Sequence, residues 1–340
     1  MTEQLVYQRS FKIILLITIS FLACYMALIY LIDPLQLFRK ATFYQPVYVD
    51  ELYQNPGIAK NYDYDTVIIG SSVAENFKPS LINQSLAMHA IKLTLQAANA
   101  REEKIILETA LSSGNVKNVI LGIDDFSFKS NDGPRSNFPY HLYHFSTLTD
   151  KLQYVLNIGH LKSIVQMIVA NVTHRGNLNL EQAYSWEYDF SENRVINNWS
   201  ILKKNHLAIE QFPLNKMQQN FDTTILHIIK NNPQVSFYLF YPPYSYLAYK
   251  KMLADGDLEN FLKFKQHIFA ATQSLANVKI FDFQTETNIT THLNNYKDII
   301  HYSKNINDYM VLNFKNTHYL VTASNIDNFR ENLIKQAKRT

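Results

Sequence analysis

The chain has 340 residues, of which 47% are hydrophobic and 18% are charged. This composition is typical of a folded globular protein and excludes an intrinsically disordered one. The formal net charge is only +3, and no run of basic residues concentrates it, so nucleic acid is not an expected partner. A single cysteine, Cys24, excludes an intramolecular disulfide and a cysteine-based zinc site.

An uncharged apolar run extends from Ile13 to Ile32. As a helix it would be about 30 Å long, which matches the hydrocarbon core of a bilayer. A cleaved signal peptide and a buried core helix are the alternatives. The run is longer than the apolar region of most signal peptides, and no small-residue cleavage site follows it. We therefore predict an uncleaved transmembrane anchor over residues 11–32, after a short cytoplasmic tail at 1–10. Basic residues lie on both sides of the run, so charge alone does not fix the topology.

Residues 33–61 have the features of a juxtamembrane connector. Asp33-Pro34 ends the apolar run, and Pro46 and Pro56 interrupt a tyrosine-rich stretch. The main domain is predicted to follow at 62–335.

Short apolar runs rich in β-branched and aromatic residues predict five strands, at 66–69, 90–95, 118–123, 235–240 and 278–281. Segments with helical apolar spacing lie between most of them, at 102–111, 215–231 and 257–275. This alternation predicts an α/β fold in which helices cover both faces of a mostly parallel sheet. A stretch at about 130–213 interrupts the alternation, contains a predicted helix at 150–170, and is expected to form an insertion over one end of the sheet.

The first candidate for chemistry is the segment Gly70-Ser71-Ser72, directly after the first predicted strand. In open α/β sheets the ligand lies beyond the carboxyl ends of the strands. A hydroxyl at this turn would be exposed there, and the backbone N–H groups of the turn could stabilise an oxyanion. The plainer alternative is a serine that only caps or shapes the turn.

The second candidate is the pair Asp298 and His301. Residues three apart share one side of a helical turn, so the carboxylate could hold one imidazole nitrogen while the other accepts a serine proton. Alone, the pair is weak evidence for catalysis, because a surface aspartate and a half-buried histidine without a catalytic role can have the same spacing. The serine follows the first strand and the pair follows the last, however, which places all three residues at one edge of the sheet.

These motifs resemble those of the SGNH hydrolases, also called GDSL esterases. The run Thr66-Val-Ile-Ile-Gly70-Ser71-Ser72 is similar to the first block of that family, with Ser71 in place of its aspartate, and Asp298-Ile-Ile-His301 is similar to the last block. The resemblance covers most of 61–310. It is nearest to membrane-anchored SGNH-like proteins of bacterial envelopes, a group that includes the D protein of teichoic-acid D-alanylation and the SGNH partners of polysaccharide O-acylation.

The resemblance implies a three-layer α/β/α fold with a five-stranded flavodoxin-like sheet, and it implies that Ser72, His301 and Asp298 form a catalytic triad that needs no cofactor or metal. The residues expected around the oxyanion are Ser71, Ala98, Asn99 and Asp125. Two departures from the family stand out. The region of the second block, Leu95-Gln-Ala-Ala-Asn99, has no glycine. The region of the third block, Gly122-Ile-Asp124-Asp125, carries aspartates, which cannot donate a hydrogen bond when ionised.

By this resemblance, the chain is a single-pass protein of the inner membrane whose catalytic domain is periplasmic or extracellular. It would transfer or hydrolyse acyl esters on an envelope glycan or polymer through an acyl-serine. Its substrates would be an acylated carrier or the envelope polysaccharide, and its partner a multispanning membrane O-acyltransferase. One alternative is a weakly active or inactive binding and scaffold domain on the same fold. Another, a cytosol-facing nucleotide-binding protein, is disfavoured because neither a Rossmann nor a Walker motif is present.

Two further features carry less weight. His141 and His144 are three residues apart, but no carboxylate nearby completes a set of metal ligands. Trp186 and Trp199 are candidates for stacking on sugar rings, although aromatic residues more often pack a core.

Overall fold

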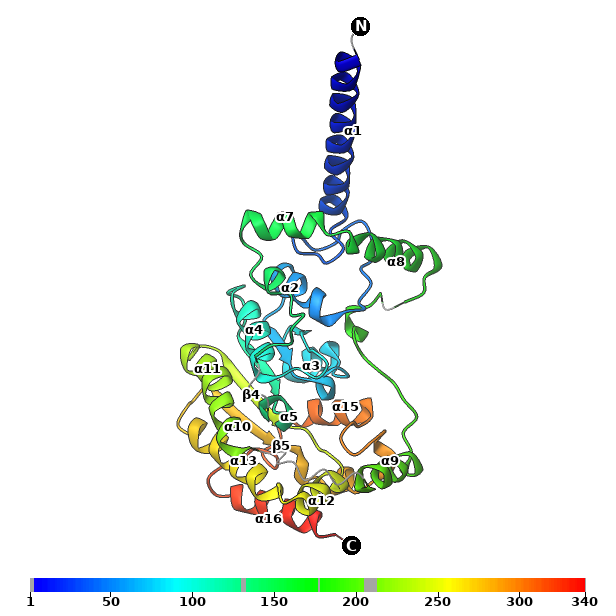
Figure 1. The fold of residues 1–340 in the computed structure, drawn as a ribbon. Coiled ribbons are helices and arrows are strands. Elements are labelled where there is room, and N and C mark those ends of the chain that lie inside the picture. The colour runs from blue at the N-terminus through cyan, green and yellow to red at the C-terminus, as the bar shows by residue number, and fades with distance from the viewer. Residues whose placement is uncertain (1–2, 130–132, 177, 205–212, 340) are drawn as a thin grey trace.

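The computed structural model of this chain describes residues 3–129, 133–176, 178–204 and 213–339. Residues 1–2 of the predicted tail, and residues 130–132, 177 and 205–212 of the predicted insertion, lie outside the described part. One long helix, α1 (Glu3–Ile32), projects from an α/β body that holds the rest of the chain (Figure 1).

The body is built on a five-stranded parallel sheet with the strand order β2-β1-β3-β4-β5. The strands are β1 (Thr66–Ile69), β2 (Ala90–Lys92), β3 (Asn118–Gly122), β4 (Ser236–Tyr241) and β5 (Val278–Asp282). In the register of the central strands, Ile68 lies opposite Ile120 and Leu121 opposite Leu239. The predicted α/β class and its flavodoxin-like strand order are confirmed.

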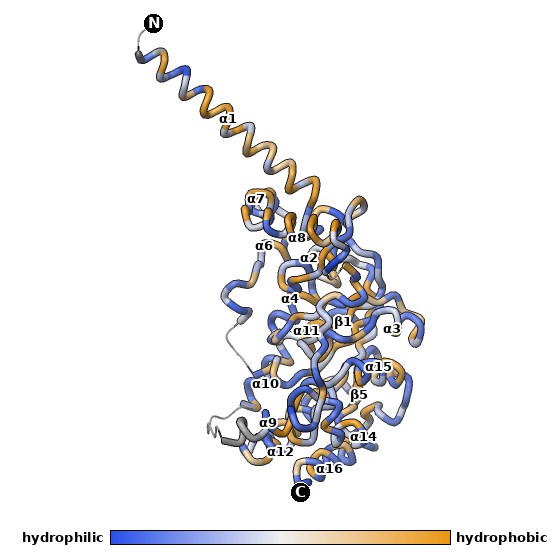
Figure 2. The backbone as a smooth tube through the Cα atoms, turned by 90° about the vertical axis from the view of Figure 1, so that its right-hand side faces the viewer, coloured by the Kyte–Doolittle hydropathy of each residue, from blue (hydrophilic) through white to orange (hydrophobic). Residues whose placement is uncertain are grey.

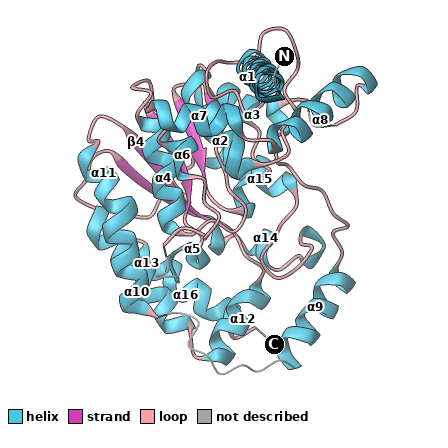
Figure 3. Ribbon diagram, turned by 45° about the horizontal axis from the view of Figure 1, so that its top comes forward, coloured by secondary structure: helices cyan, strands magenta, loops and turns pink. Residues whose placement is uncertain are grey.

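Helices cover both faces of the sheet. On one face α10 (Leu214–Phe221) contacts both α4 (Ala100–Leu111) and α13 (Leu258–Thr272), and on the other α3 (Pro79–Leu86) contacts α15 (Lys304–Asn313). Figure 3 shows the strands between these helices. Because both faces are covered, the central strands are fully buried and read as continuous apolar runs. The predicted three-layer arrangement is therefore confirmed.

The remaining helices connect or flank these layers. They are α2 (Glu51–Asn61), α5 (Asp125–Lys129), α6 (Tyr140–Tyr143), α7 (Leu148–Leu156), α8 (Gly159–Thr173), α9 (Glu192–Lys204), α11 (His227–Asn231), α12 (Tyr246–Asp255), α14 (Thr287–Thr290) and α16 (Ile326–Ala337).

The single helix predicted at 150–170 is in fact two helices, α7 and α8, which meet at an angle of 62°. Asn157 causes the break. Its backbone is extended, and its side-chain oxygen accepts the N–H of Gly159 at 2.9 Å. A side chain that bonds the backbone two residues ahead competes with helix continuation.

The prediction that 33–61 is a connector is wrong for its second half. Residues 51–61 form α2, which packs on α4 and buries Leu52 and Ile58 in the main core. Gly57 allows the chain before α2 to cross this helix closely, since a Cβ at that position would lie 2.0 Å from the carbonyl oxygen of Leu35. Only residues 33–50 therefore link α1 to the body.

Helix α1 is apolar along most of its length, as the orange colour in Figure 2 shows, and most of its large apolar side chains are exposed. Among the described helices it alone is long and apolar enough to cross a membrane by itself, a property that signal sequences share. The bent pair of α7 and α8 passes the same test only when the two are taken together.

Candidate active site

The turn after β1 exposes Ser72 at the carboxyl edge of the sheet. Gly70 makes this turn with a φ of +153°, and a Cβ there would lie 3.0 Å from the Cβ of Ala74. A residue with a side chain would strain the turn, so glycine is required. Ser72 then opens a short 3-10 turn, Ser72–Ala74, and is half-buried.

Asp298 and His301 come from a bend between β5 and α15. The prediction of a helical turn is wrong here. Both backbone N–H groups of Ile300 and His301 donate to Asp298 Oδ1 at 2.8 Å, and a bridge between Tyr296 and Tyr302 closes the bend. An aspartate that bonds the backbone two and three residues ahead favours such a bend.

The structure brings the three predicted residues together across 229 positions of sequence. Ser72 Oγ lies 2.8 Å from His301 Nε2, and His301 Nδ1 lies 2.8 Å from Asp298 Oδ2. Burial alone would raise the pKa of Asp298, but hydrogen bonds from the His301 ring and from the backbone lower it below its ordinary value. The carboxylate is therefore ionised at neutral pH and holds the proton on Nδ1, so Nε2 is free to accept the Ser72 hydroxyl proton.

Buried hydrogen bonds fix the histidine loop against the serine turn. Tyr302 Oη and Asn307 Nδ2 both donate to the carbonyl of Val73, at 2.9 and 3.1 Å. From the other side, Ser245, which follows β4, donates its hydroxyl to the carbonyl of Ile299 at 2.9 Å. Groups held in this way need little reorganisation before they react.

Trp186 contacts two of the three residues, Ser72 and His301, and it comes from the segment predicted as an insertion. Its indole N–H donates to the carbonyl of Ser72 at 3.1 Å, and its ring meets the His301 ring edge to face at 5.6 Å. The Lys297 ammonium lies 4.3 Å from the centre of the Trp186 ring and 3.9 Å from that of Tyr188. Sequence reasoning gave no position for Trp186, because its segment has no periodicity.

An open cavity of about 560 Å³ lies over Ser72 and His301. Its other lining residues are aromatic, acidic or basic in large part: Val49, Asp50, Glu51, Leu52, Tyr53, Glu75, Leu95, Gln96, Arg135, Asn137, Tyr184, Trp186, Tyr188 and Lys297. A second cavity of about 480 Å³ beneath α8 shares Val49, Asp50 and Tyr53 with the first. The two cavities therefore adjoin.

Two of the residues predicted to surround the oxyanion are engaged elsewhere. The hydroxyl of Ser71 donates to Asp124 Oδ2 at 2.6 Å, and Tyr244 donates to the other oxygen of the same carboxylate at 2.5 Å. Asp125 is buried and pairs with Lys129 at 3.1 Å. Neither Ser71 nor Asp125 lines the cavity over Ser72, so the side chains of both are directed away from the place predicted for the oxyanion.

The segment that replaces the family's second block is engaged as well. Ala98 donates its N–H within its own turn, to the carbonyl of Leu95, and Asn99 caps α4 with its side chain. The N–H of Gln96 donates to the Glu51 carboxylate at 2.6 Å. The N–H of Ala98 and the side-chain oxygen of Asn99, which were predicted to lie near the oxyanion, are thus used within this turn and at the start of α4.

Between these residues and Leu95, Ala97 adopts a φ of +52°, the left-handed conformation that favours glycine.

A buried charge network that the sequence analysis missed forms part of the cavity wall. Lys92, in β2, donates to the carbonyl of Glu75 at 2.7 Å and to the Ser185 hydroxyl at 3.0 Å. Burial lowers the pKa of Lys92 to about 8. Burial also raises the pKa of Glu51 and Glu75, and the nearby charge of Glu51 raises the pKa of Glu75 further. The only sequence signal was a lysine in an otherwise apolar strand.

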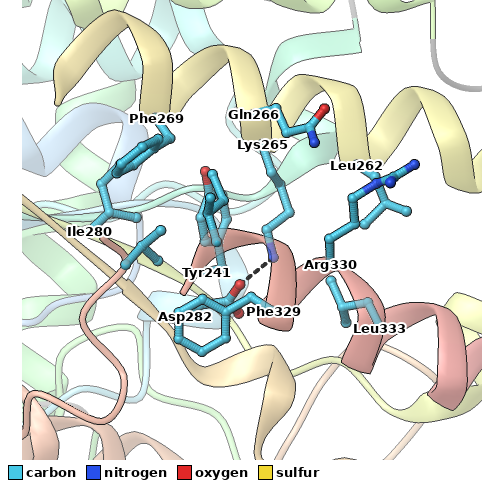
Figure 4. A pocket seen from close by; sticks show the side chains of 12 residues that line it. Tyr241, Leu262, Lys265, Gln266, Phe269, Ile280, Asp282, Phe329, Arg330 and Leu333 are labelled. Atoms are coloured by element: carbon cyan, nitrogen blue, oxygen red, sulfur yellow. Dashed lines mark hydrogen bonds and ion pairs between the residues drawn. The ribbon is translucent and has the colours of Figure 1, made fainter. Parts of the chain in front are cut away.

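A third cavity, between α13, β5 and α16, is unrelated to Ser72 (Figure 4). It contains a buried ion pair in which Lys265 Nζ lies 2.5 Å from Asp282 Oδ2. Its volume is about 20 Å³, which is room for about one water molecule. This cavity is therefore too small for a substrate.

Within the described ranges, no group of three or more histidine, cysteine or acidic side chains is arranged to hold a metal ion, and His141 and His144 belong to no such group.

Comparisons with known proteins add little to this geometry. No protein-family model matches the chain, and no curated protein does. Among solved structures, one match is a protein from Streptococcus pneumonia provisionally described as a platelet activating factor. It is 11% identical over 79% of this chain and 90% of its own, with a TM-score of 0.42. The chemistry of the site therefore rests on its own geometry.

Proposed function

We propose that the chain is a membrane-anchored serine hydrolase or acyltransferase of the SGNH type. Ser72 is the nucleophile, His301 the general base and acid, and Asp298 the group that orients the imidazole. The supporting observation is the unbroken chain of two hydrogen bonds, each 2.8 Å, from Ser72 Oγ through the His301 ring to Asp298. A nucleophile in contact with a base that is oriented by a third group is the arrangement required for covalent acyl catalysis.

In this mechanism Ser72 Oγ attacks the carbonyl carbon of an ester while His301 Nε2 takes the hydroxyl proton. The imidazolium then lies against the ionised Asp298. When the tetrahedral intermediate collapses, the leaving alcohol takes the proton from Nε2 and the acyl group stays on Ser72. An acceptor hydroxyl next gives its proton to Nε2 and attacks the acyl-serine. When this second intermediate collapses, the bond from the acyl carbon to Ser72 Oγ breaks and Oγ takes the proton back from Nε2. Hydrolysis and transfer differ only in whether that acceptor is water or an alcohol.

The lining of the cavity favours a polyhydroxylated acceptor. Aromatic rings such as Trp186 and Tyr188 can stack on sugar faces, and the carboxyl groups beside them can bond hydroxyls. We therefore propose an envelope glycan or polymer as the acceptor and an acylated carrier as the donor. With α1 as a single-pass anchor in the inner membrane, the site would lie on the periplasmic or extracytoplasmic side. A multispanning membrane O-acyltransferase as partner is part of this proposal and derives from the family resemblance.

A weakly active or inactive scaffold is the second candidate, and the environment of Asp124 favours it. This carboxylate lies at the position of the third family block, where it accepts from Ser71 and Tyr244 and so offers no donor to an oxyanion. The scaffold would hold a glycan or a membrane partner without acylating itself.

The two candidates differ in how the detergent-solubilised full chain reacts with a p-nitrophenyl ester. The enzyme should release a burst of nitrophenol equal to the amount of protein, and a glycan acceptor should then speed turnover if the reaction is transfer. Ser72→Ala should abolish the burst, whereas Ser71→Ala, the matched control one residue away, should keep it. In cells that depend on this chain for O-acylation of the envelope, a scaffold would tolerate Ser72→Ala but not loss of the whole chain.

A further inference from the structure

Helices α7 and α8 carry an exposed apolar surface that no described part of the chain covers. On each helix the exposed apolar side chains form one stripe at helical spacing. The stripe on α7 continues through the break between the two helices to the stripe on α8. The exposed side chains are Leu148, Leu152, Leu156, Ile158, Leu161, Val165, Ile168, Val169 and Val172. Six of these nine are more than half exposed, and Ile158 and Val172 are about three-quarters exposed. We call this set the collar stripe.

The other sides of α7 and α8 face the body of the protein. Tyr154 and Val155 of α7 and Ile164 of α8 are buried in a small core beneath them. On the other side of α8, Lys162 and Gln166 point to the second cavity, which separates this helix from the body. The collar stripe therefore lies on neither the core side nor the cavity side of α8 and faces outward.

Both helices are fixed to the base of α1. The Tyr154 hydroxyl donates to the buried Asp33 carboxylate at 2.8 Å, just after α1 ends, and Tyr25 of α1 donates its hydroxyl to the carbonyl of Asn157 at 2.8 Å. Ile29 of α1 belongs to the same small core as Tyr154. Figure 1 shows α7 and α8 on either side of α1, at the level where α1 leaves the body. A membrane that held α1 would thus have its surface at these helices.

We propose that the collar stripe lies in the lipid headgroup and acyl-chain boundary of the membrane that α1 spans, so that α7 and α8 rest on the bilayer as an amphipathic collar around the anchor. This inference rests on the proposed anchoring by α1, and it goes beyond the proposed chemistry of Ser72. An apolar stripe with charged flanks, parallel to the membrane surface, is the physical signature of an interfacial helix.

The charges of this region fit an anionic lipid surface. Residues 148–176 contain three basic side chains, Lys151, Lys162 and Arg175, and one acidic side chain, Asp150. Basic residues beside a membrane anchor attract anionic headgroups. The collar would also hold the cavity beneath α8, and the adjoining Ser72 cavity, at a fixed height above the bilayer.

The test uses the full chain reconstituted into vesicles of phosphatidylcholine and phosphatidylglycerol with brominated acyl chains. In a Cys24→Ser background, the variants Val165→Cys, Gln166→Cys and Leu312→Cys are each labelled with a small fluorophore. Val165 lies on the stripe, Gln166 is its neighbour on the cavity side, and Leu312 is an exposed residue on α15. The native Cys24, labelled in the unaltered chain, reports on α1 itself.

The proposal predicts that bromine quenches the label at Val165 at least about twofold more than those at Gln166 and Leu312, because only the first contacts acyl chains. Equal quenching at Val165 and Leu312 would overturn it. Quenching at Cys24 without quenching at Val165 would do the same while leaving the anchor intact, and would point to a protein partner on the stripe. The measurement involves no ester chemistry, so an inert Ser72 and a stripe without lipid contact are distinguishable results.

Discussion

The indole N–H of Trp186 donates to the main-chain carbonyl of Ser72 across 3.1 Å, although 114 residues separate the two. This bond ties the region predicted as an insertion to the turn that presents the nucleophile. The same indole ring packs edge to face against His301, so one side chain contacts the backbone of the nucleophile's residue and the ring of the base.

Loss of this contact should slow acylation without abolishing it. Trp186→Phe keeps an aromatic ring beside His301 but removes the hydrogen bond, which contributes about 1 kcal/mol, or about fivefold in rate. The single-turnover rate with an activated ester measures this effect. Trp199→Phe is the control, because Trp199 packs against the core and forms no part of the cavity. An equal loss of rate in both variants would indicate that Trp186 affects the rate only by stabilising the fold.

Asp298→Asn should reduce the acylation rate strongly, by about 10³–10⁴-fold, by analogy with triads in which the aspartate sets the imidazole tautomer. The amide no longer fixes the proton on Nδ1, so Nε2 ceases to be a reliable acceptor. The rate of nitrophenol release in the burst is the readout. A variant that retains more than about a tenth of the wild-type rate would show that Asp298 does not orient His301.

Ser71→Ala should destabilise the protein while leaving Ser72 reactive. The buried Asp124 carboxylate would lose one of its two side-chain donors, which costs about 1–3 kcal/mol. Thermal unfolding in detergent should show a lower midpoint, and the ester burst should keep its full amplitude. If the burst disappears from a folded variant, the nucleophile is Ser71 instead.

Glu75→Gln should flatten the dependence of stability on pH. The raised pKa of Glu75 means that the folded state keeps a proton that the unfolded chain loses above about pH 4.3. Stability therefore falls as pH rises from that value toward the raised pKa, by about 1.4 kcal/mol per pKa unit at most. Lys92 has the opposite sign and acts only above about pH 8. Between pH 5 and 8 the raised pKa of Glu51 acts in the same direction as that of Glu75, so Glu75→Gln should remove only the part of the pH dependence that Glu75 contributes.

The measurement is the unfolding midpoint at several pH values, with Glu331→Gln, an exposed glutamate on α16, as the control. The Glu75 variant should lose part of the pH dependence, and the control should match the wild type. Parallel curves for wild type and Glu75→Gln would mean that Glu75 is ionised in the folded protein.

The sequence was sufficient for the parts of the molecule that repeat a simple pattern. All five strands lie where short β-branched runs predicted them, because a strand buried on both faces needs apolar residues at every position. Ser72 and His301 could be placed at one sheet edge from strand order alone. The 2.8 Å contact between them could not be predicted, since it depends on the bend at Asp298 and on the loop after β4.

Other parts of the site have no local signature. Glu51 lies in a stretch with two prolines, which therefore resembled a linker. Its burial depends on the packing of α2 against α4. The residues predicted around the oxyanion have other partners. The partner of Ser71, Asp124, is 53 positions away in the sequence and is set by tertiary geometry. Ala98, Asn99 and Asp125 have partners within their own turn or helix, which the family motif does not reveal.

As a nucleophile, Ser72 should form a covalent bond with an electrophilic probe. Mass spectrometry of the full chain after reaction with a fluorophosphonate, followed by peptide mapping, detects this bond. We expect one adduct per chain, on Ser72, that is lost in Ser72→Ala and His301→Ala and kept in Ser71→Ala. An adduct that persists in folded Ser72→Ala, or the absence of any adduct on the folded wild-type chain, would contradict it.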